Sequence, residues 1–298
     1  MIAAYKVRHD THYRYTTIVA TSQHTACLKP RDLPYQHTRV HQLLVEPGPS
    51  SASERVDYFG NIVDHFQIVR PHTELSVSAR SVVEVHDRQQ PIDPDASGRW
   101  EHLEAMSSDV AQFRFASPHV PLTAEMRAFA EPSFPASQTI LGGALDLMHR
   151  IHAGFSFDAS ATNVSTPVTR VLAERRGVCQ DFAHFQLSCL RSLGLAARYV
   201  SGYLLTDPPP GQPRLIGADA SHAWIAVYCP QHGWVDLDPT NDVVVGQRHV
   251  TLAWGRDYSD VSPLRGVLLG GADHSLHVSV SVVPADDPIQ AIVQLGSD

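Results

Sequence analysis

The stretch that decides the fold is Arg175-Arg176-Gly177-Val178-Cys179-Gln180-Asp181-Phe182-Ala183-His184-Phe185. A glycine turn leads directly into a cysteine that opens a strongly helical segment. Apolar residues then recur on one helical face, at Phe182, Phe185, Cys189, Leu190 and Leu193. Gly194 follows as a natural C-terminal cap. We therefore predict a helix that begins at Cys179 and packs one face against a core.

Cys179 lies in the first turn of this helix, where unpaired backbone N–H groups and the helix dipole favour a negative charge. The thiolate is the reactive form of cysteine, and a helix N-terminus favours it. Most free cysteines, however, are small buried apolar residues. The helix alone makes Cys179 a candidate nucleophile and leaves a purely structural role open.

Composition bounds the class of protein. The chain has 298 residues, 43% apolar and 18% charged, enough for one large or two ordinary globular domains. Its net charge is −8 without any run of Lys and Arg, which argues against a nucleic-acid or anionic-membrane partner. No segment reaches the ~20 apolar residues of a membrane span, and no secretory signal is visible at the N-terminus. We expect a cytoplasmic protein.

Residues 1–90 show the alternation of β-strands, most clearly over 5–15 and 75–85. We expect a β-sandwich-like or barrel-like N-terminal domain there. Residues 91–136 are proline-rich and predict a linker with one short helix near 123–130. Residues 137–298 form the expected second domain, which makes the fold class α+β.

Within the second domain, a strand over 196–205 runs into a proline-rich loop, 207–213. Residues 221–228 and 234–238 predict two antiparallel strands joined by a hairpin. This pairing places His222, at the start of one strand, and Asp238, at the end of the other, at the same end of the sheet. Residues 276–283 alternate again and predict a further strand of this sheet.

A thiol-dependent enzyme needs a thiolate, an imidazole within reach and a group that orients the imidazole. Cys179, His222 and Asp238 supply these three in chain order. Asp236 is a rival for the third role, because it lies two residues earlier and shares the same strand face. A zinc site on Cys179, His184 and His222 is disfavoured, since it lacks the second clustered ligand pair of structural zinc sites.

Four blocks of this sequence resemble the transglutaminase-like superfamily. The blocks are Gly177-Val178-Cys179-Gln180-Asp181-Phe182-Ala183, Gly202-Tyr203, His222-Ala223-Trp224, and Gly233-Trp234 running into Asp238-Pro239-Thr240. Residues 1–85 resemble the β-rich domain that precedes this core in many bacterial members. The resemblance implies a papain-like core, with the cysteine helix packed on an antiparallel sheet, and a Cys-His-Asp triad acting on amides.

Carried over by the resemblance, Cys179 is the nucleophile, His222 the base and then acid, and Asp238 the orienting carboxylate. Tyr203 and Phe157 are candidates for lining the substrate cleft, whereas Trp224 and Trp234 are expected in the core. The expected reaction is hydrolysis of a peptide or protein amide through a thioester, with no cofactor and no metal. Transamidation by an amine, or a non-catalytic binding module that kept the fold, are the alternatives.

Overall fold

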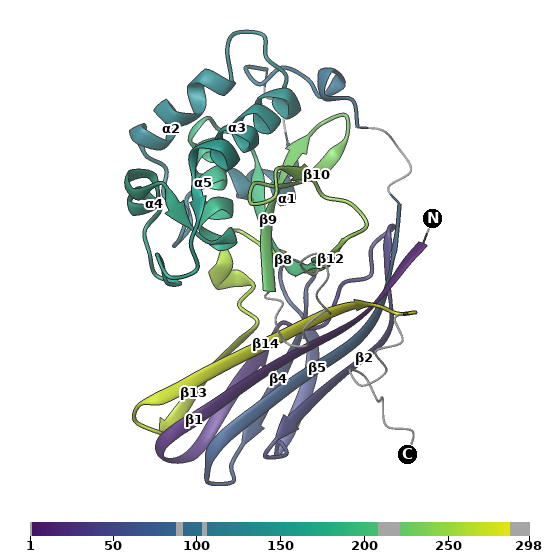
Figure 1. The fold of residues 1–298 in the computed structure, drawn as a ribbon, viewed down its shortest axis with the longest axis vertical. Helices are drawn as coiled ribbons and strands as arrows, with labels where there is room; N and C mark the ends of the chain where they lie inside the picture. Colours follow the sequence, from purple (N-terminus) through teal and green to yellow (C-terminus); the bar gives the residue numbers. More distant parts are fainter. Residues whose placement is uncertain (1, 88–91, 103–105, 208–220, 287–298) are drawn as a thin grey trace.

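The computed structural model describes residues 2–87, 92–102, 106–207 and 221–286. A lobe of helices around a sheet lies above a second sheet of long, curled strands (Figure 1). The α+β class expected from the sequence is confirmed, as is the β-rich N-terminal region.

The long sheet is built around β1, which runs from Ile2 to Ala26. The first half of β1 pairs with both β5 and β14, and the second half with both β4 and β13, all antiparallel. β2 pairs with β5, and β3 with β4. The bounds of the other strands of this sheet are β2 Gln36–Glu46, β3 Ser51–Val56, β4 Ile62–Ile68, β5 His72–His86, β13 Leu264–Gly270 and β14 His274–Pro284.

The two halves of this sheet serve different cores. Alternating residues around the second half of β1, such as Val19, Phe66 and Leu75, enclose a core of their own. Residues of the first half, such as Val7 and Val83, join the main core of the helical lobe. A single apolar cluster therefore runs across the junction between the two parts of the molecule.

The second sheet holds five strands in the order β11-β10-β9-β8-β12. Their bounds are β8 Ala197–Leu204, β9 Ser221–Cys229, β10 Gly233–Asp238, β11 Val243–Val244 and β12 His249–Gly255. The short strands β6 (Ser156–Phe157) and β7 (Arg176–Gly177) pair in parallel just before the central helix.

Helix α5, from Cys179 to Ser192, packs against β8 and β9 and against α2, α3 and α4. The remaining helices are α1 Ser108–Ala111, α2 Ala124–Ala130, α3 Ile140–Gly154 and α4 Val168–Glu174. Single 3₁₀ turns occur at η1 Pro94–Ala96, η2 Gln112–Arg114, η3 Glu131–Ser133 and η4 Tyr258–Asp260. The predicted helix at Cys179 is confirmed, with Gly194 in the left-handed region at φ +85° after its end.

The strand predicted over 276–283 exists as β14, but its assignment to the second domain's sheet is wrong. β14 pairs with β1 over eleven positions, from Tyr5 opposite Pro284 to Tyr15 opposite His274. β13 pairs with β1 as well, so residues 264–284 return to the N-terminal sheet. Within the expected second domain, 137–298, residues 264–284 therefore pair with the N-terminal sheet and not with the five-stranded sheet. β1 is long enough to take two strands in succession along each edge, and period-two alternation cannot tell which sheet a strand joins.

Two buried amides of the N-terminal part bind the backbone of β12, the edge strand of the five-stranded sheet. Gln36 Nε2 donates to the Thr251 carbonyl oxygen at 2.8 Å, and Gln36 Oε1 accepts from the Thr251 N–H at 2.8 Å. Asn61 Nδ2 likewise donates to the Trp254 carbonyl oxygen at 2.9 Å, and Asn61 Oδ1 accepts from the Trp254 N–H at 3.0 Å. These side chains satisfy backbone groups that a neighbouring strand would otherwise pair.

Candidate active site

Helix α5 holds Cys179 at its first position, half-buried. Asp181, in the same first turn, accepts a hydrogen bond from the Val178 N–H at 2.8 Å and one from the Thr162 hydroxyl. A side chain at residue 177 would collide with Asp181, since a Cβ there would lie 2.7 Å from its Oδ2. Gly177 is therefore required so that Asp181 can cap the helix that carries the thiol.

His222 and Asp238 meet at one end of the β9–β10 hairpin, as predicted. His222 Nε2 donates to Asp238 Oδ2 at 2.7 Å, and both side chains are buried or nearly so. The carboxylate that reaches His222 is thus Asp238 and not its rival Asp236. Because Nε2 is engaged by Asp238, the other ring nitrogen is the one available for the hydrogen bond between His222 and Cys179.

Asp238 is completely buried and accepts five hydrogen bonds from described residues. Oδ1 accepts from the backbone N–H groups of Thr240 at 2.9 Å and Asn241 at 3.3 Å. Oδ2 accepts from His222, from Asn241 Nδ2 at 2.7 Å and from His249 Nε2 at 3.1 Å. Both oxygens are saturated, so the plane of the carboxylate is fixed.

The charges of the pair follow from these contacts. Burial raises the pKa of the Asp238 carboxyl, but the hydrogen bonds from His222, His249 and Asn241 outweigh it and hold the pKa well below its usual range. Burial lowers the pKa of His222, but its interactions with Asp238 and Cys179 have the larger effect and raise the pKa from 6.5 to about 10. The site therefore favours an imidazolium beside the sulfur at neutral pH.

His249 and Asn241 also contact Asp238, and neither was among the residues predicted from the sequence. Asn241 follows Asp238-Pro239-Thr240 and is bonded to Asp238 from within the same turn. Its proximity to Asp238 in the chain was a usable signal. His249 reaches the site from β12, beyond β8, and no spacing in the sequence connects it with residue 238.

The two residues expected to line the cleft lie in different environments. Tyr203 is 1% exposed, and its hydroxyl is hydrogen-bonded to His9 Nδ1 of the N-terminal sheet at 2.9 Å. The structure thus places Tyr203 in the junction between the two sheets. Phe157 is 61% exposed and pairs with Gly177, two residues before Cys179. Trp224 lies in the core as expected, and Trp234 is partly buried against it.

Known proteins show where this arrangement belongs. Residues 127–239 match the transglutaminase-like superfamily, and residues 5–84 match the bacterial transglutaminase-like N-terminal region. An uncharacterized protein of Mycobacterium tuberculosis is 40% identical over 290 residues, covering 94% of this chain and 92% of the relative. The chain belongs to the transglutaminase-like superfamily.

Two further matches place this superfamily member among proteins with assigned descriptions. A 158-residue region, 52% of this chain, is 27% identical to a protein-glutamine gamma-glutamyltransferase of Pseudomonas aeruginosa and covers 22% of that protein. A crystal structure from Cytophaga hutchinsonii, described as that of a proposed cysteine protease, matches with a TM-score of 0.76 at 20% identity. That match covers 96% of this chain and 92% of the other. It shows the same fold.

Two groups of side chains in this transglutaminase-like chain consist of residue types that can bind metals. Among the described residues, the grouping of three potential ligands is His222, Asp238 and His249, whose ligand atoms lie within 4.8 Å of one another. The hydrogen bonds of both imidazoles to one Asp238 oxygen account for this convergence, and we assign no metal to it. The zinc site considered on Cys179, His184 and His222 stays disfavoured. His184 Nε2 accepts a hydrogen bond from the Tyr258 N–H, and the His184 ring stacks on His119.

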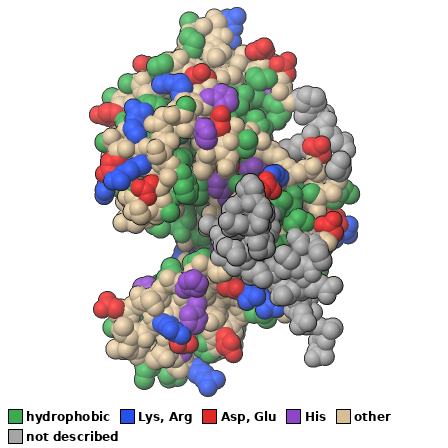
Figure 2. All heavy atoms as spheres, viewed as in Figure 1, with side chains coloured by type: hydrophobic (Ala, Val, Ile, Leu, Met, Phe, Trp, Pro, Cys, Tyr) green, Lys and Arg blue, Asp and Glu red, His purple; other side chains and the backbone are tan. Residues whose placement is uncertain are grey.

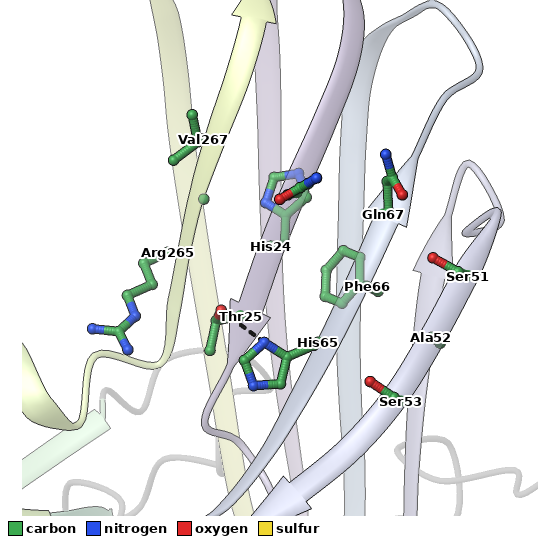
Figure 3. A pocket seen from close by; sticks show the side chains of 12 residues that line it. His24, Thr25, Ser51, Ala52, Ser53, His65, Phe66, Gln67, Arg265 and Val267 are labelled. Carbon is green, nitrogen blue, oxygen red and sulfur yellow. Dashed lines mark hydrogen bonds between the residues drawn. The ribbon is translucent and has the colours of Figure 1, made fainter. Parts of the chain in front are cut away.

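A hollow of about 510 Å³ lies in the N-terminal sheet, away from these residues, and is lined by β1, β3, β4 and β13 (Figure 3). Polar side chains make up most of its lining, and Thr25 of β1 is hydrogen-bonded to His65, its neighbour on β4, at 3.4 Å. No thiol or carboxylate lines this hollow, so Cys179 remains the better candidate site. The proline-rich loop expected over 207–213 lies, after its first residue, outside the described residues.

The surface shown in Figure 2 carries acidic and basic side chains intermixed, without a continuous basic patch. Within the described part of the chain, no helix combines the length and apolar character that a bilayer crossing requires.

Proposed function

We propose that this protein is a cysteine-dependent amide hydrolase in which Cys179 attacks the substrate, His222 transfers protons and Asp238 orients His222. The observation that carries the proposal is the bond from His222 Nε2 to a buried, saturated Asp238, and Cys179 is among the groups that raise the pKa of His222. A thiol, an imidazole and a carboxylate in series are the parts that thiol acyl transfer requires.

The reaction proceeds in two halves. The Cys179 sulfur attacks the amide carbonyl carbon, and the negative charge develops on the carbonyl oxygen. The Cys179 backbone N–H is at the first position of α5, where it has no acceptor within the helix, and it is suited to donate to that oxygen. When the C–N bond breaks, the His222 imidazolium gives its proton to the leaving amine, and a thioester to Cys179 remains.

Water then attacks the thioester carbon. Neutral His222 accepts the proton of the water, the C–S bond breaks, and the carboxylic acid leaves. Asp238 stays ionised throughout, because its role is to hold the ring and to stabilise the imidazolium. Phe157, exposed next to the helix start, is our candidate for contacting the substrate chain.

Cys179→Ala tests the proposal directly. Iodoacetamide should alkylate the wild-type protein at Cys179, and intact-mass analysis should show this adduct missing from the variant. The other three cysteines are buried and serve as internal controls. Hydrolysis of amide substrates should be lost in Cys179→Ala while its thermal unfolding is unchanged. Hydrolysis that persists in the variant would refute the proposal.

Transamidation is the second candidate, and the match to a protein-glutamine gamma-glutamyltransferase favours it. The same thioester would be attacked by an amine in place of water. Mass spectrometry of the products with and without added amine separates the two reactions. A product heavier by the amine less one water, relative to the hydrolysed acid, identifies transamidation.

A binding module that kept the fold is the remaining alternative. Such a protein needs no activated thiol. Alkylation of Cys179 at the slow rate of a free, unactivated cysteine would favour it over both reactions.

A further inference from the structure

His249 contacts the proposed catalytic carboxylate from outside the three residues that the chemistry needs. It lies at the start of β12 and is 5% exposed. Its Nε2 is 3.1 Å from Asp238 Oδ2, the same oxygen that accepts from His222. Since an ionised carboxylate only accepts hydrogen bonds, Nε2 of His249 must carry a proton.

The opposite ring nitrogen gives a reason to look for function. Nδ1 of His249 is buried and has no hydrogen-bond partner among the described residues. Leaving a buried polar atom unpaired destabilises a fold, so the position would suit an apolar side chain of the same shape better. The ring packs edge-on against Trp224, with centroids 5.2 Å apart, which an apolar ring would also do. The contact with Asp238 is therefore the interaction that only a side chain with an N–H at this point supplies.

The geometry around Asp238 shows what that contact does. The two backbone N–H groups that bind Oδ1 and the Asn241 amide that binds Oδ2 all come from the turn that follows Asp238. His249 is the donor to Oδ2 that comes from β12, on the far side of β8 and β9 from β10. It ties the carboxylate to a strand outside the β9–β10 hairpin. Movement of the turn alone therefore does not carry Asp238 away from His222.

We propose that His249 is a positioning residue that holds the Asp238 carboxylate in the orientation in which it receives the His222 N–H. It does not touch the sulfur or the substrate, and it acts through Asp238. This inference rests on the proposed function, because it concerns the same site.

The test compares four full-length proteins by the second-order rate of Cys179 alkylation with iodoacetamide between pH 5 and 10. His249→Phe keeps a planar ring against Trp224 and removes the N–H. His249→Gln keeps an N–H at about the reach of Nε2. His249→Asn keeps an amide whose N–H ends short of Asp238, and it serves as the matched polar control. The assay needs no known substrate, and thermal unfolding is measured on every variant.

We expect His249→Phe to lower the alkylation rate at pH 7 by about 10-fold or more, since a hydrogen bond to a charged group is lost. The pH at which the rate is half-maximal should move with it. His249→Gln should stay within about 3-fold of wild type, and His249→Asn should resemble His249→Phe. If His249→Phe does not fold, the Gln and Asn pair gives the answer.

A purely structural His249 would lower the unfolding temperature and leave the alkylation profile unchanged, and that result overturns the inference. Equal rates for His249→Gln and His249→Asn overturn it as well. The proposed function fails separately. A wild-type protein alkylated no faster than free cysteine removes the proposed function and this inference together, whereas fast wild-type alkylation that His249→Phe leaves intact removes the inference alone.

Discussion

Asp238→Asn changes the carboxylate on which the hydrogen bonds of the proposed site converge. In the native protein both carboxylate oxygens face donors only. Asparagine replaces one oxygen with an NH₂ group. If that group takes the place of Oδ2, it faces the N–H groups of His222, His249 and Asn241. If the amide is flipped, it faces the backbone N–H groups of Thr240 and Asn241. Either orientation sets donor against donor and removes the negative charge.

The expected loss follows from the pKa of His222. The pKa rises from 6.5 to about 10, which at 1.36 kcal/mol per pKa unit corresponds to roughly 5 kcal/mol in favour of the imidazolium. Asp238 and Cys179 both contribute to this rise through a hydrogen bond and a charge interaction. We assign Asp238 about half, or on the order of 2–3 kcal/mol, which corresponds to roughly a 30- to 150-fold change in an equilibrium constant.

Alkylation of Cys179 by iodoacetamide at pH 7 measures this loss, because the reactive thiolate is stabilised by the neighbouring imidazolium. We expect Asp238→Asn to lower the second-order rate by roughly 30- to 150-fold. Asp236→Asn is the matched control. It makes the same chemical change at another buried aspartate on the same strand, and its rate should stay close to wild type. A small effect of Asp238→Asn together with a large effect of Asp236→Asn would refute our assignment of the carboxylate.

Two further predictions concern pH and packing. The raised pKa of His222 stabilises the fold fully below pH 6.5, the pKa of the unfolded state, and this contribution is lost as the pH rises through about 10. The difference in unfolding free energy between wild type and Asp238→Asn should therefore shrink between pH 6.5 and about 10. Denaturant titrations at a series of pH values measure this difference. Hydrolysis should also fall above pH 10 while alkylation does not, because only hydrolysis needs the imidazolium proton; parallel profiles would contradict this. Gly202→Ala should lower the free energy of unfolding by about 1–3 kcal/mol, since a Cβ there would lie 2.2 Å from the Val250 carbonyl oxygen and 2.3 Å from the Trp224 ring. Gly48→Ala, where a Cβ meets nothing within 4 Å, is its control, and equal stabilities of the two variants would show that the packing argument is wrong.

The centre of the proposed site was predictable because its parts are local signals. The apolar face after Cys179 and Gly194 defined α5, and the 231–233 turn joined β9 to β10. A tight hairpin fixes which strand ends meet, so His222 and Asp238 followed from the turn without knowledge of the rest of the fold. Asp236 lies on the same face of β10, so the strand pattern alone does not separate it from Asp238. The resemblance favoured Asp238, which precedes Pro239-Thr240, and Asp238 is the residue bonded to His222.

The features that the sequence did not reveal depend on long-range pairing. β3 has no buried position, so its sequence lacks the alternation that marks a half-buried strand. β13 and β14 pair with β1 across 238 or more residues of chain, and nothing in their local pattern distinguishes that partner from the nearer five-stranded sheet. The contact between His249 and Asp238 also depends on long-range pairing, because it forms only when β12 pairs with β8.

The N-terminal sheet and the proposed site are connected through this same strand. His249 lies two residues before Thr251, whose backbone N–H and carbonyl are both bound by Gln36, and five before Trp254, which Asn61 binds in the same way. Both amides are buried, so without them these backbone groups of an edge strand would lose their partners inside the junction. The N-terminal sheet thus completes the edge of the five-stranded sheet, at the strand from which His249 reaches Asp238. This connection gives the β-rich region a physical reason to accompany the transglutaminase-like core: it fixes the strand on which the orientation of the carboxylate depends.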